Sequence, residues 1–395
     1  MIRSLLTSPD FLRLWSVGAL SNAMRWLELL VTGLYTFAVT GSASAVAEIS
    51  AARMMPMLLF GAISGAVSES VNRKYILLGG LCLSSLTAGT LATLAAAGRL
   101  ELWHIAVGGF ISGSVWSNEM ATRRRMIGEV AGQKRVARAI AVDSVTNAGT
   151  HMAGPVLGGI VVELLGITGA YCLSAIAQLA CVLIVSGLAY AQETRPLELG
   201  RIPTDILAGL RAAEKQPIIW MVFVVTVIVN VFAFSYTSLV APIGSDQFGV
   251  SPALVGILAG AEPFGGIIGG AVLAAGAVQL GSKSVFIGGS AVFFLSLITM
   301  SLLPFYWLAL LVLFLGGLGT AGFSNMQSTL ILTEAPADMR SRLLGIVTVC
   351  IGTGPLGVLA AGFLANRLGP SGAVLAMASF GLCAVLLTAT RVPKF

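Results

Sequence analysis

The chain has 395 residues, of which 56% are hydrophobic and only 10% are charged, and its mean hydropathy is +0.93. A soluble domain has about 45–50% apolar and about 25% charged residues, so this composition excludes an ordinary soluble protein. The formal net charge of +6 comes from basic residues scattered between apolar runs, so it does not indicate binding to a nucleic acid.

The apolar runs have the length needed to cross a membrane. A helix of about 20 apolar residues spans the hydrocarbon core, and its backbone polar groups are satisfied within the helix. We therefore predict an all-α integral membrane protein with twelve transmembrane helices. The predicted spans are 12–38, 45–67, 74–98, 102–124, 137–165, 168–190, 217–241, 252–278, 283–303, 305–330, 341–366 and 371–391.

One polar stretch divides the spans into two groups of six. The segment from Gln192 to Gln216 carries four basic and four acidic residues, which is unusual in a chain with so few charges. We expect an N-terminal six-helix bundle over 1–190, a cytoplasmic linker over 191–216 and a C-terminal six-helix bundle over 217–395.

The distribution of Lys and Arg predicts the orientation of the chain. If both termini are cytoplasmic, Arg99 and Arg367 are the only basic residues in outer loops, and Arg25 and Arg53 lie within spans. Nearly all the others fall on the inner side, as the positive-inside rule requires. We predict a multi-pass protein of the inner membrane with its N- and C-termini inside.

The first span carries a polar stripe, in which successive residues are four and three positions apart. This spacing places them on one helical face. Arg25 and Glu28 lie near mid-span, where a charge costs at least about 2.5–3.5 kcal/mol and needs a cavity or a partner. Arg53, at a similar depth in the second span, is a second candidate partner for Glu28. These residues form either a structural ion pair or part of a substrate or proton pathway. The stripe consists of Ser21, Arg25, Glu28, Thr32 and Tyr35.

The loop after the second span reads Gly65-Ala-Val-Ser-Glu69-Ser-Val-Asn72-Arg73-Lys74. It resembles the signature loop between helices 2 and 3 of the major facilitator superfamily, Gly-x-x-x-Asp-x-x-x-Arg-Arg/Lys. Glu69 stands where the family has Asp, and Arg73 and Lys74 occupy the basic positions. The resemblance implies that Glu69 joins a charge network that latches the two halves on the cytoplasmic side.

The fifth span carries Asp143, Asn147 and His151 on one face, followed by Gly154-Pro155-Val-Leu-Gly158-Gly159. The second element resembles the helix 5 motif of proton-coupled exporters in this superfamily. Small residues also let helices approach closely, so packing alone is the alternative interpretation. A mid-span histidine is a candidate for titration near neutral pH, or it is simply hydrogen-bonded.

In the second half, Asn230, Glu262, Asn325 and Gln327 are polar residues within predicted spans. Glu262 has no basic residue in its own span, and a buried carboxyl without a counter-charge can take up a proton. The halves echo each other: Gly154-Pro155 of the fifth span recurs as Gly354-Pro355 in the eleventh. Such parallel repeats are typical of transporter halves related by an axis normal to the membrane.

The resemblance covers the whole chain and implies the major facilitator fold with two pseudo-symmetric bundles. It implies an exporter of a drug-like or siderophore-like small molecule that works by proton antiport and alternating access. An importer of an organic anion, nutrient or metal complex is one alternative, with Arg25 or Arg53 binding the anion. A non-transporting membrane sensor or assembly factor is another.

The sequence contains no enzyme motif that we recognise. It has no Walker loop, HExxH or GxSxG element, and its five cysteines lie in predicted spans without metal-ligand spacing. We expect no cofactor and no metal. The expected partners are a small-molecule substrate, protons and the lipid bilayer, and we expect a monomer.

Overall fold

A computed structural model describes residues 8–390 apart from 134, 191, 193–212, 215, 278–279 and 337–338; the side chains of 62–69, 120–121 and 341 are also outside the description. Most of the predicted linker, 191–216, therefore lies outside the described residues. All the elements in the described part of the chain are helical. They are α2 (Pro9–Thr40), α3 (Ala43–Ser70), α4 (Arg73–Ala96), α5 (Leu102–Ala131), α6 (Val136–Ser186), α8 (Pro217–Phe232), η1 (Phe234–Leu239), α9 (Val240–Pro242), η2 (Ile243–Gln247), α10 (Pro252–Ala274), α11 (Ser282–Leu302), α12 (Tyr306–Glu334), α13 (Arg340–Ile351) and α14 (Gly354–Thr390).

The predicted segments are found, but several are joined or divided differently. The fifth and sixth predicted spans form one long helix, α6, which turns at Gly166, where φ is 65°. The eleventh predicted span is divided between α13 and the first part of α14, and the twelfth follows within α14 through Gly369, where φ is 74°. A left-handed backbone of this kind is open to glycine at little cost, so each pair of spans is joined by a single residue. The seventh predicted span leaves the α-helical form after Phe232 and continues through 3₁₀ and π turns.

By length and composition, eight helical segments of the described chain can cross a membrane. Two of these, Val136–Ser186 and Arg342–Thr390, contain the turns at Gly166 and Gly369. The long helices α2 and α5 fall outside this set of eight. The architecture is that of the predicted fold, and the number of twelve membrane crossings stays a prediction.

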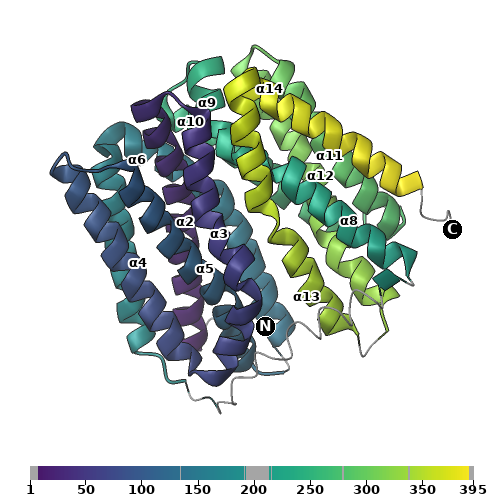
Figure 1. Cartoon of the computed structure of the whole chain (residues 1–395). Coiled ribbons are helices and arrows are strands. Elements are labelled where there is room, and N and C mark those ends of the chain that lie inside the picture. The colour runs from purple at the N-terminus through teal and green to yellow at the C-terminus, as the bar shows by residue number, and fades with distance from the viewer. Residues whose placement is uncertain are drawn as a thin grey trace.

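The two halves of the chain form neighbouring groups of helices (Figure 1), with the first half running from purple to blue-teal and the second from teal through green to yellow. They meet where α6 packs against α10 and where α3 packs against α14. We call the end of the helices that holds the turns at Gly41, Gly166 and Gly369 the Gly41 end. The opposite end, which holds Arg73, is the Arg73 end. The predicted orientation makes the Gly41 end external.

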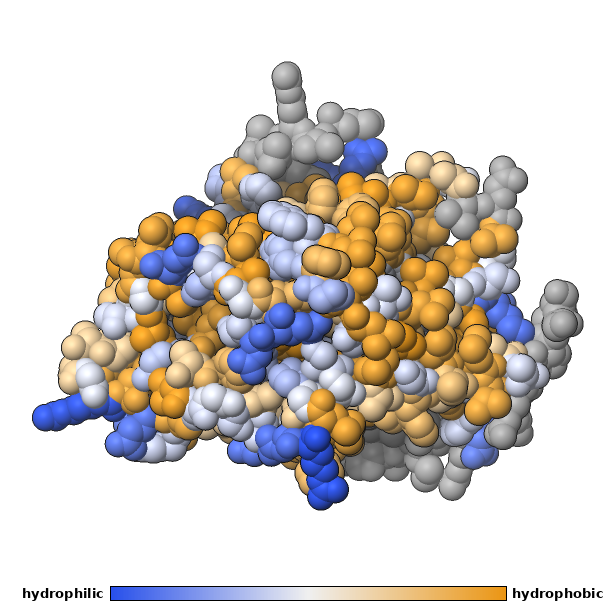
Figure 2. Space-filling model, turned by 90° about the horizontal axis from the view of Figure 1, so that it is seen from above, coloured by the Kyte–Doolittle hydropathy of each residue, from blue (hydrophilic) through white to orange (hydrophobic). Residues whose placement is uncertain are grey.

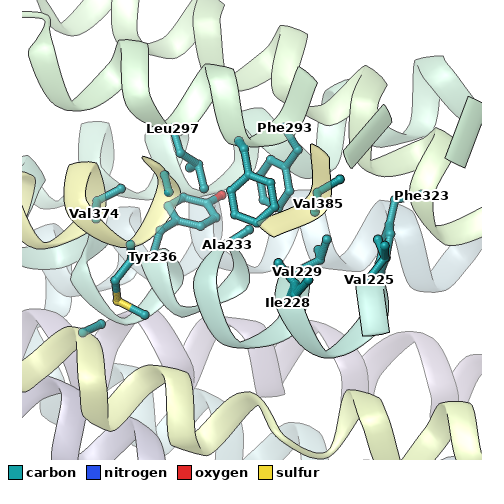
Figure 3. Close-up of a cluster of buried hydrophobic side chains, with 14 of the residues drawn as sticks. Val225, Ile228, Val229, Ala233, Tyr236, Phe293, Leu297, Phe323, Val374 and Val385 are labelled. Atoms are coloured by element: carbon teal, nitrogen blue, oxygen red, sulfur yellow. The ribbon is translucent and has the colours of Figure 1, made fainter. Parts of the chain in front are cut away.

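The interior of the second half is closely packed and apolar. Figure 3 shows a part of it in which the rings of Tyr236 and Phe293 lie close together, surrounded by aliphatic side chains. Their ring centroids are 6.0 Å apart in an edge-to-face arrangement, which is a favoured geometry for aromatic pairs.

Large apolar side chains also cover much of the outer surface. Leu86, Leu164 and Trp307 are each more than two-thirds exposed. Such exposed apolar side chains along the helices indicate contact with lipid rather than with water. Figure 2 looks onto the helix ends from above the view of Figure 1 and shows hydrophilic residues in separate patches between apolar ones.

Candidate transport pathway

A small pocket, with a cavity volume of about 40 Å³, lies between the two halves. The first half contributes Trp26 and Ser50 and, from α6, His151 and Pro155; the second half contributes residues that include Tyr236. His151 stacks on Trp26, with ring centroids 3.6 Å apart. Of the predicted pathway residues, His151 is the one that lines this inter-half pocket.

The glycines of α6 set the approach of its neighbours on two sides. A methyl group on Gly154 would lie 2.5 Å from Trp26 Cβ, and one on Gly158 would lie 3.0 Å from the Leu27 carbonyl oxygen, so this face packs on α2. On the other side, a methyl group on Gly159 would lie 2.2 Å from the carbonyl oxygen of Pro252 in α10. The Gly-Pro-x-x-Gly-Gly motif therefore joins α2 to the second half of the protein.

The second half repeats this arrangement. A methyl group on Gly357 of α14 would lie 2.1 Å from the Val231 carbonyl oxygen in α8, and one on Gly362 would lie 2.5 Å from Ala47 Cβ in α3. Thus α14 stands to α8 and α3 as α6 stands to α2 and α10. The Gly-Pro repeat seen in the sequence reflects this pseudo-symmetry.

The two halves are also tied by a carboxylate at the Gly41 end. Glu163 of α6 accepts a hydrogen bond of 3.0 Å from the backbone N–H of Ala253, in the first turn of α10. The N-cap residue of α10, Ser251, makes no side-chain capping bond. Glu163 therefore satisfies a free N–H at the positive end of the α10 dipole from across the interface.

The charged residues near mid-span in the first half do not form the pair of neighbours on one helix, Arg25 with Glu28. Glu28 forms its ion pair with Arg53, with Nη2 and Oε2 2.9 Å apart, and it also accepts a hydrogen bond from Ser174. This is the second of the two partners considered from the sequence. The Arg25 guanidinium instead lies 4.5 Å from the ring centroid of Trp116 and has no carboxylate within 4.0 Å among the described residues. A pair between Arg25 and Glu28 is thus not formed.

The polar face of α6 contacts its own bundle. Asp143 accepts a hydrogen bond of 2.5 Å from Arg123 of α5, and both side chains are buried. One turn on, Asn147 accepts from Asn22 of α2 at 2.5 Å. The next turn carries His151. The face predicted from spacing is real, and its first two members are hydrogen-bonded within the first half.

In the second half, Glu262 is buried and accepts a hydrogen bond of 2.6 Å from Thr320 of α12. It has no Lys or Arg within 4.0 Å among the described residues, and it is absent from the lining of the inter-half pocket. Its carboxyl lies between α10 and α12.

The other polar residues of the second half are bonded locally. Asn230 donates to the carbonyl of Thr226, and Gln327 donates to the Thr226 hydroxyl at 2.7 Å. Asn325 donates to the Ala321 carbonyl within its own helix and is exposed. These contacts join α8 to α12 but do not bring the three side chains to one site with Glu262.

The signature loop is described in part. The side chains at Gly65 and Glu69 lie outside the described residues, so the proposed latch acid is not placed. Arg73 makes two hydrogen bonds to the Glu129 carboxylate, at 2.8 and 3.0 Å, and one of 2.9 Å to the Tyr190 hydroxyl. Lys74 donates to the carbonyls of Ser186 and Leu188 at the C-terminal end of α6. These basic residues join α4 to α5 and α6 within the first half.

Sequence reasoning did not single out several of these partners. Glu129, Glu163, Trp116 and Gln178 were passed over because their importance depends on which helices are adjacent. An isolated glutamine inside the apolar sixth span was the one available signal, because an amide in a membrane interior needs a hydrogen-bond partner. No cluster of three potential metal ligands occurs among the residues that the structure describes.

The fold and the pocket between the halves define a membrane transporter of the major facilitator type. The chain belongs to the transmembrane secretion effector family of that superfamily, whose sequence model matches residues 4–395. One similar protein is the multidrug efflux pump Tap of Mycolicibacterium fortuitum, which is 24% identical over 370 residues; the match covers 89% of each chain. Another is the multidrug efflux pump Tap of Mycobacterium tuberculosis (strain ATCC 25618 / H37Rv), which is 24% identical over 380 residues; the match covers 89% of this chain and 87% of that one.

Solved structures show the same fold at low sequence identity. The nucleoside transporter NupG superposes with a TM-score of 0.78 at 13% identity, covering 97% of this chain and 99% of its own. The POT family transporter PepTSo also has a TM-score of 0.78, at 11% identity and 97% coverage of both chains. These structures show the fold, and the family and the similar proteins identify the chain as a transporter and not an enzyme.

Proposed function

We propose that this protein exports a small molecule across the inner membrane in exchange for protons, by alternating access. The observation that carries the proposal is the inter-half pocket, because residues of both halves line it. In this state its cavity volume is about 40 Å³, below the roughly 300–1,000 Å³ of small-molecule sites, so the proposal requires the pocket to widen as the halves move apart. The outward direction is supported by the two similar proteins named as multidrug efflux pumps.

The contacts between the halves describe one state of the proposed cycle. The close approaches of Gly159 to Pro252 and of Gly362 to Ala47, and the bond from Ala253 to Glu163, all lie toward the Gly41 end. With that end external, the pocket is closed to the outside in this state and a substrate enters from the cytoplasm. Release requires these contacts to break while equivalent contacts form at the Arg73 end.

Proton coupling is assigned to Glu262. A buried carboxylate without a cation is costly, and taking up a proton removes that cost. Thr320 supplies a single hydrogen bond in place of an ion pair. Proline at 263 lies inside the helix, where the missing N–H locally weakens α10 and favours bending at this level. Glu28 and His151 are the alternative sites of protonation.

Reconstituted vesicles test both direction and coupling. Candidate substrates come from comparing compounds retained by cells that lack the protein and cells that overproduce it. Glu262→Gln, which mimics the protonated acid, is expected to retain substrate exchange but to lose accumulation driven by a pH gradient. Glu48→Gln is the matched control because Glu48 is an exposed carboxylate on α3.

Three results of these experiments would each contradict a different part of the proposal. Gradient-driven accumulation that survives Glu262→Gln excludes Glu262 and moves the assignment to Glu28 or His151. Flux in the opposite direction favours the importer alternative. The absence of any flux by the folded wild-type protein favours the non-transporting alternative.

A further inference from the structure

A second hollow lies inside the first half, apart from the inter-half pocket. It shares no lining residue with that pocket. Five helices, α2 to α6, surround it, and its lining is almost entirely polar or charged. We call it the side hollow. Its key residues are Arg25, Trp116, Glu119 and Gln178.

Two of these side chains have hydrogen-bonding atoms without a partner. Gln178 is only 6% exposed, and its Oε1 has no hydrogen-bond donor among the described residues. The indole Nε1 of Trp116 is likewise buried and unpaired in the described part of the chain. Buried polar atoms are nearly always satisfied, so an acceptor and a donor left open in one hollow indicate a missing hydrogen-bonding group.

The charges of the side hollow are also left incomplete. Arg53 and Glu28 neutralise each other at 2.9 Å. Arg25 has aromatic neighbours but no carboxylate within 4.0 Å among the described residues. Glu119 accepts a hydrogen bond from Ser21 at 2.9 Å, whereas its nearest cation, Arg123, is 3.9 Å away.

Arg123 is only a weak partner for Glu119, because it forms a closer ion pair with Asp143. Its Nη1 lies 2.5 Å from Asp143 Oδ1, in a pair of buried side chains. The side hollow is therefore lined by the opposite charges of Arg25 and Glu119, which form no direct ion pair with each other within 4.0 Å.

We infer that the side hollow binds the charged end of an amino-acid-type zwitterion, with its carboxylate at Arg25 and its ammonium group at Glu119 and Gln178. The Arg25 guanidinium offers paired donors that suit a carboxylate, and the Trp116 N–H adds another donor. The Gln178 Oε1 and the Glu119 carboxylate are acceptors for the ammonium protons. The inference rests on the proposed function, because it takes this zwitterion to be part of the exported substrate.

Other occupants complement the side hollow less well. An anion leaves the Glu119 charge without a partner, and a simple cation faces Arg25. Water satisfies the open hydrogen bonds and separates Arg25 from Glu119 without adding a charge next to either. The cavity volume of the side hollow in this state is about 20 Å³, room for about one water, so binding of a head group requires the surrounding helices to move apart.

Thermal unfolding of the purified full-length protein, followed by ligand titration, tests this assignment directly. A ligand that binds the native state raises the unfolding midpoint by an amount that grows with ln(1 + L/Kd), where L is the free ligand concentration. L-Alanine and L-leucine are expected to raise the midpoint with this dependence on concentration. Propionate and ethylamine, which carry one charge each, are the matched probes and are expected to produce no such rise at the same concentration and ionic strength.

Two variants and one control locate the binding site. Arg25→Gln and Gln178→Leu are each expected to weaken amino-acid binding at least about tenfold, which corresponds to one order of magnitude in Kd. Gln178→Leu is also expected to leave the ligand-free midpoint unchanged or higher, because it removes an unsatisfied buried oxygen. A purely structural role predicts a lower midpoint instead. Arg99→Gln, at an exposed turn, is expected to bind as the wild type does.

The inference is overturned if neither amino acid raises the midpoint, or if propionate or ethylamine raises it equally. It is also overturned if Gln178→Leu binds as tightly as the wild type, and this variant decides the matter should Arg25→Gln fail to fold. Failure here is separate from failure of the export proposal: gradient-driven export of another compound stands without amino-acid binding. Conversely, binding without vesicle flux supports the site and removes the export role.

Discussion

Replacement of Gly159 by alanine is expected to open the Gly41 end of the protein. The added methyl group would lie 2.2 Å from the carbonyl oxygen of Pro252 and 3.0 Å from Ala253 Cα, and both are backbone atoms. Since ordinary contacts begin near 3.4 Å, α10 must move away by about 1 Å. Overpacking of this kind costs about 1–3 kcal/mol. If this cost falls only on the state in which the Gly41 end is closed, the equilibrium shifts toward the open state roughly 5- to 150-fold.

Spin labels can report this shift as a distance across the Gly41 end. Cysteines at Arg99 and Phe305 place one exposed label on each half, in a background without the five native cysteines. Double electron–electron resonance spectroscopy is expected to show that a larger fraction of Gly159→Ala molecules has a long distance between the two labels. Gly149→Ala is the matched control on α6, because a methyl group there meets nothing within 4 Å. Identical distance distributions in the two variants would refute the steric argument.

Two further changes probe ionic contacts. Glu163→Ala removes the acceptor for the Ala253 N–H. We expect a smaller shift toward the open Gly41 end, worth below about 1 kcal/mol because the carboxylate is exposed. The control Glu48→Ala should leave the same spin-label distances unchanged. Glu28→Gln leaves Arg53 buried without its counter-charge and is expected to cost about 3–5 kcal/mol of stability. Adding Arg53→Gln should restore part of that loss in thermal unfolding, and a double variant no more stable than the single one would contradict the pairing.

The helices were predictable because their signal is local. Runs of apolar residues determine where a chain can cross a lipid bilayer, and the Gly-Pro repeats of α6 and α14 indicate two related halves. The long helices α2 and α5 were predicted despite their charges, since the polar residues of α2 share one face. The single-residue turns at Gly166 and Gly369 were less visible, because nothing in a hydropathy pattern distinguishes a tight turn from a short loop.

The pairing of charges was only partly predictable, because it depends on helix rotation and on side-chain direction. Arg25 and Glu28 are three residues apart, which allows a pair on one helix. In the structure Glu28 reaches Arg53 on α3, whereas Arg25 reaches Trp116 on α5. Similarly, the sequence placed Glu262 near mid-span but did not indicate that its partner is Thr320 on α12.

The turns at Gly166 and Gly369 have a mechanical consequence. With one glycine as the whole connection, the two arms of each helical hairpin have no slack between them. The arms that carry Gly159 and Gly362 touch the opposite half. In the proposed alternating-access cycle, a tilt of either arm would displace its companion, because the connection has no spare residues to absorb the movement. Separation of the halves at the Gly41 end would then be coupled to rearrangement inside each bundle.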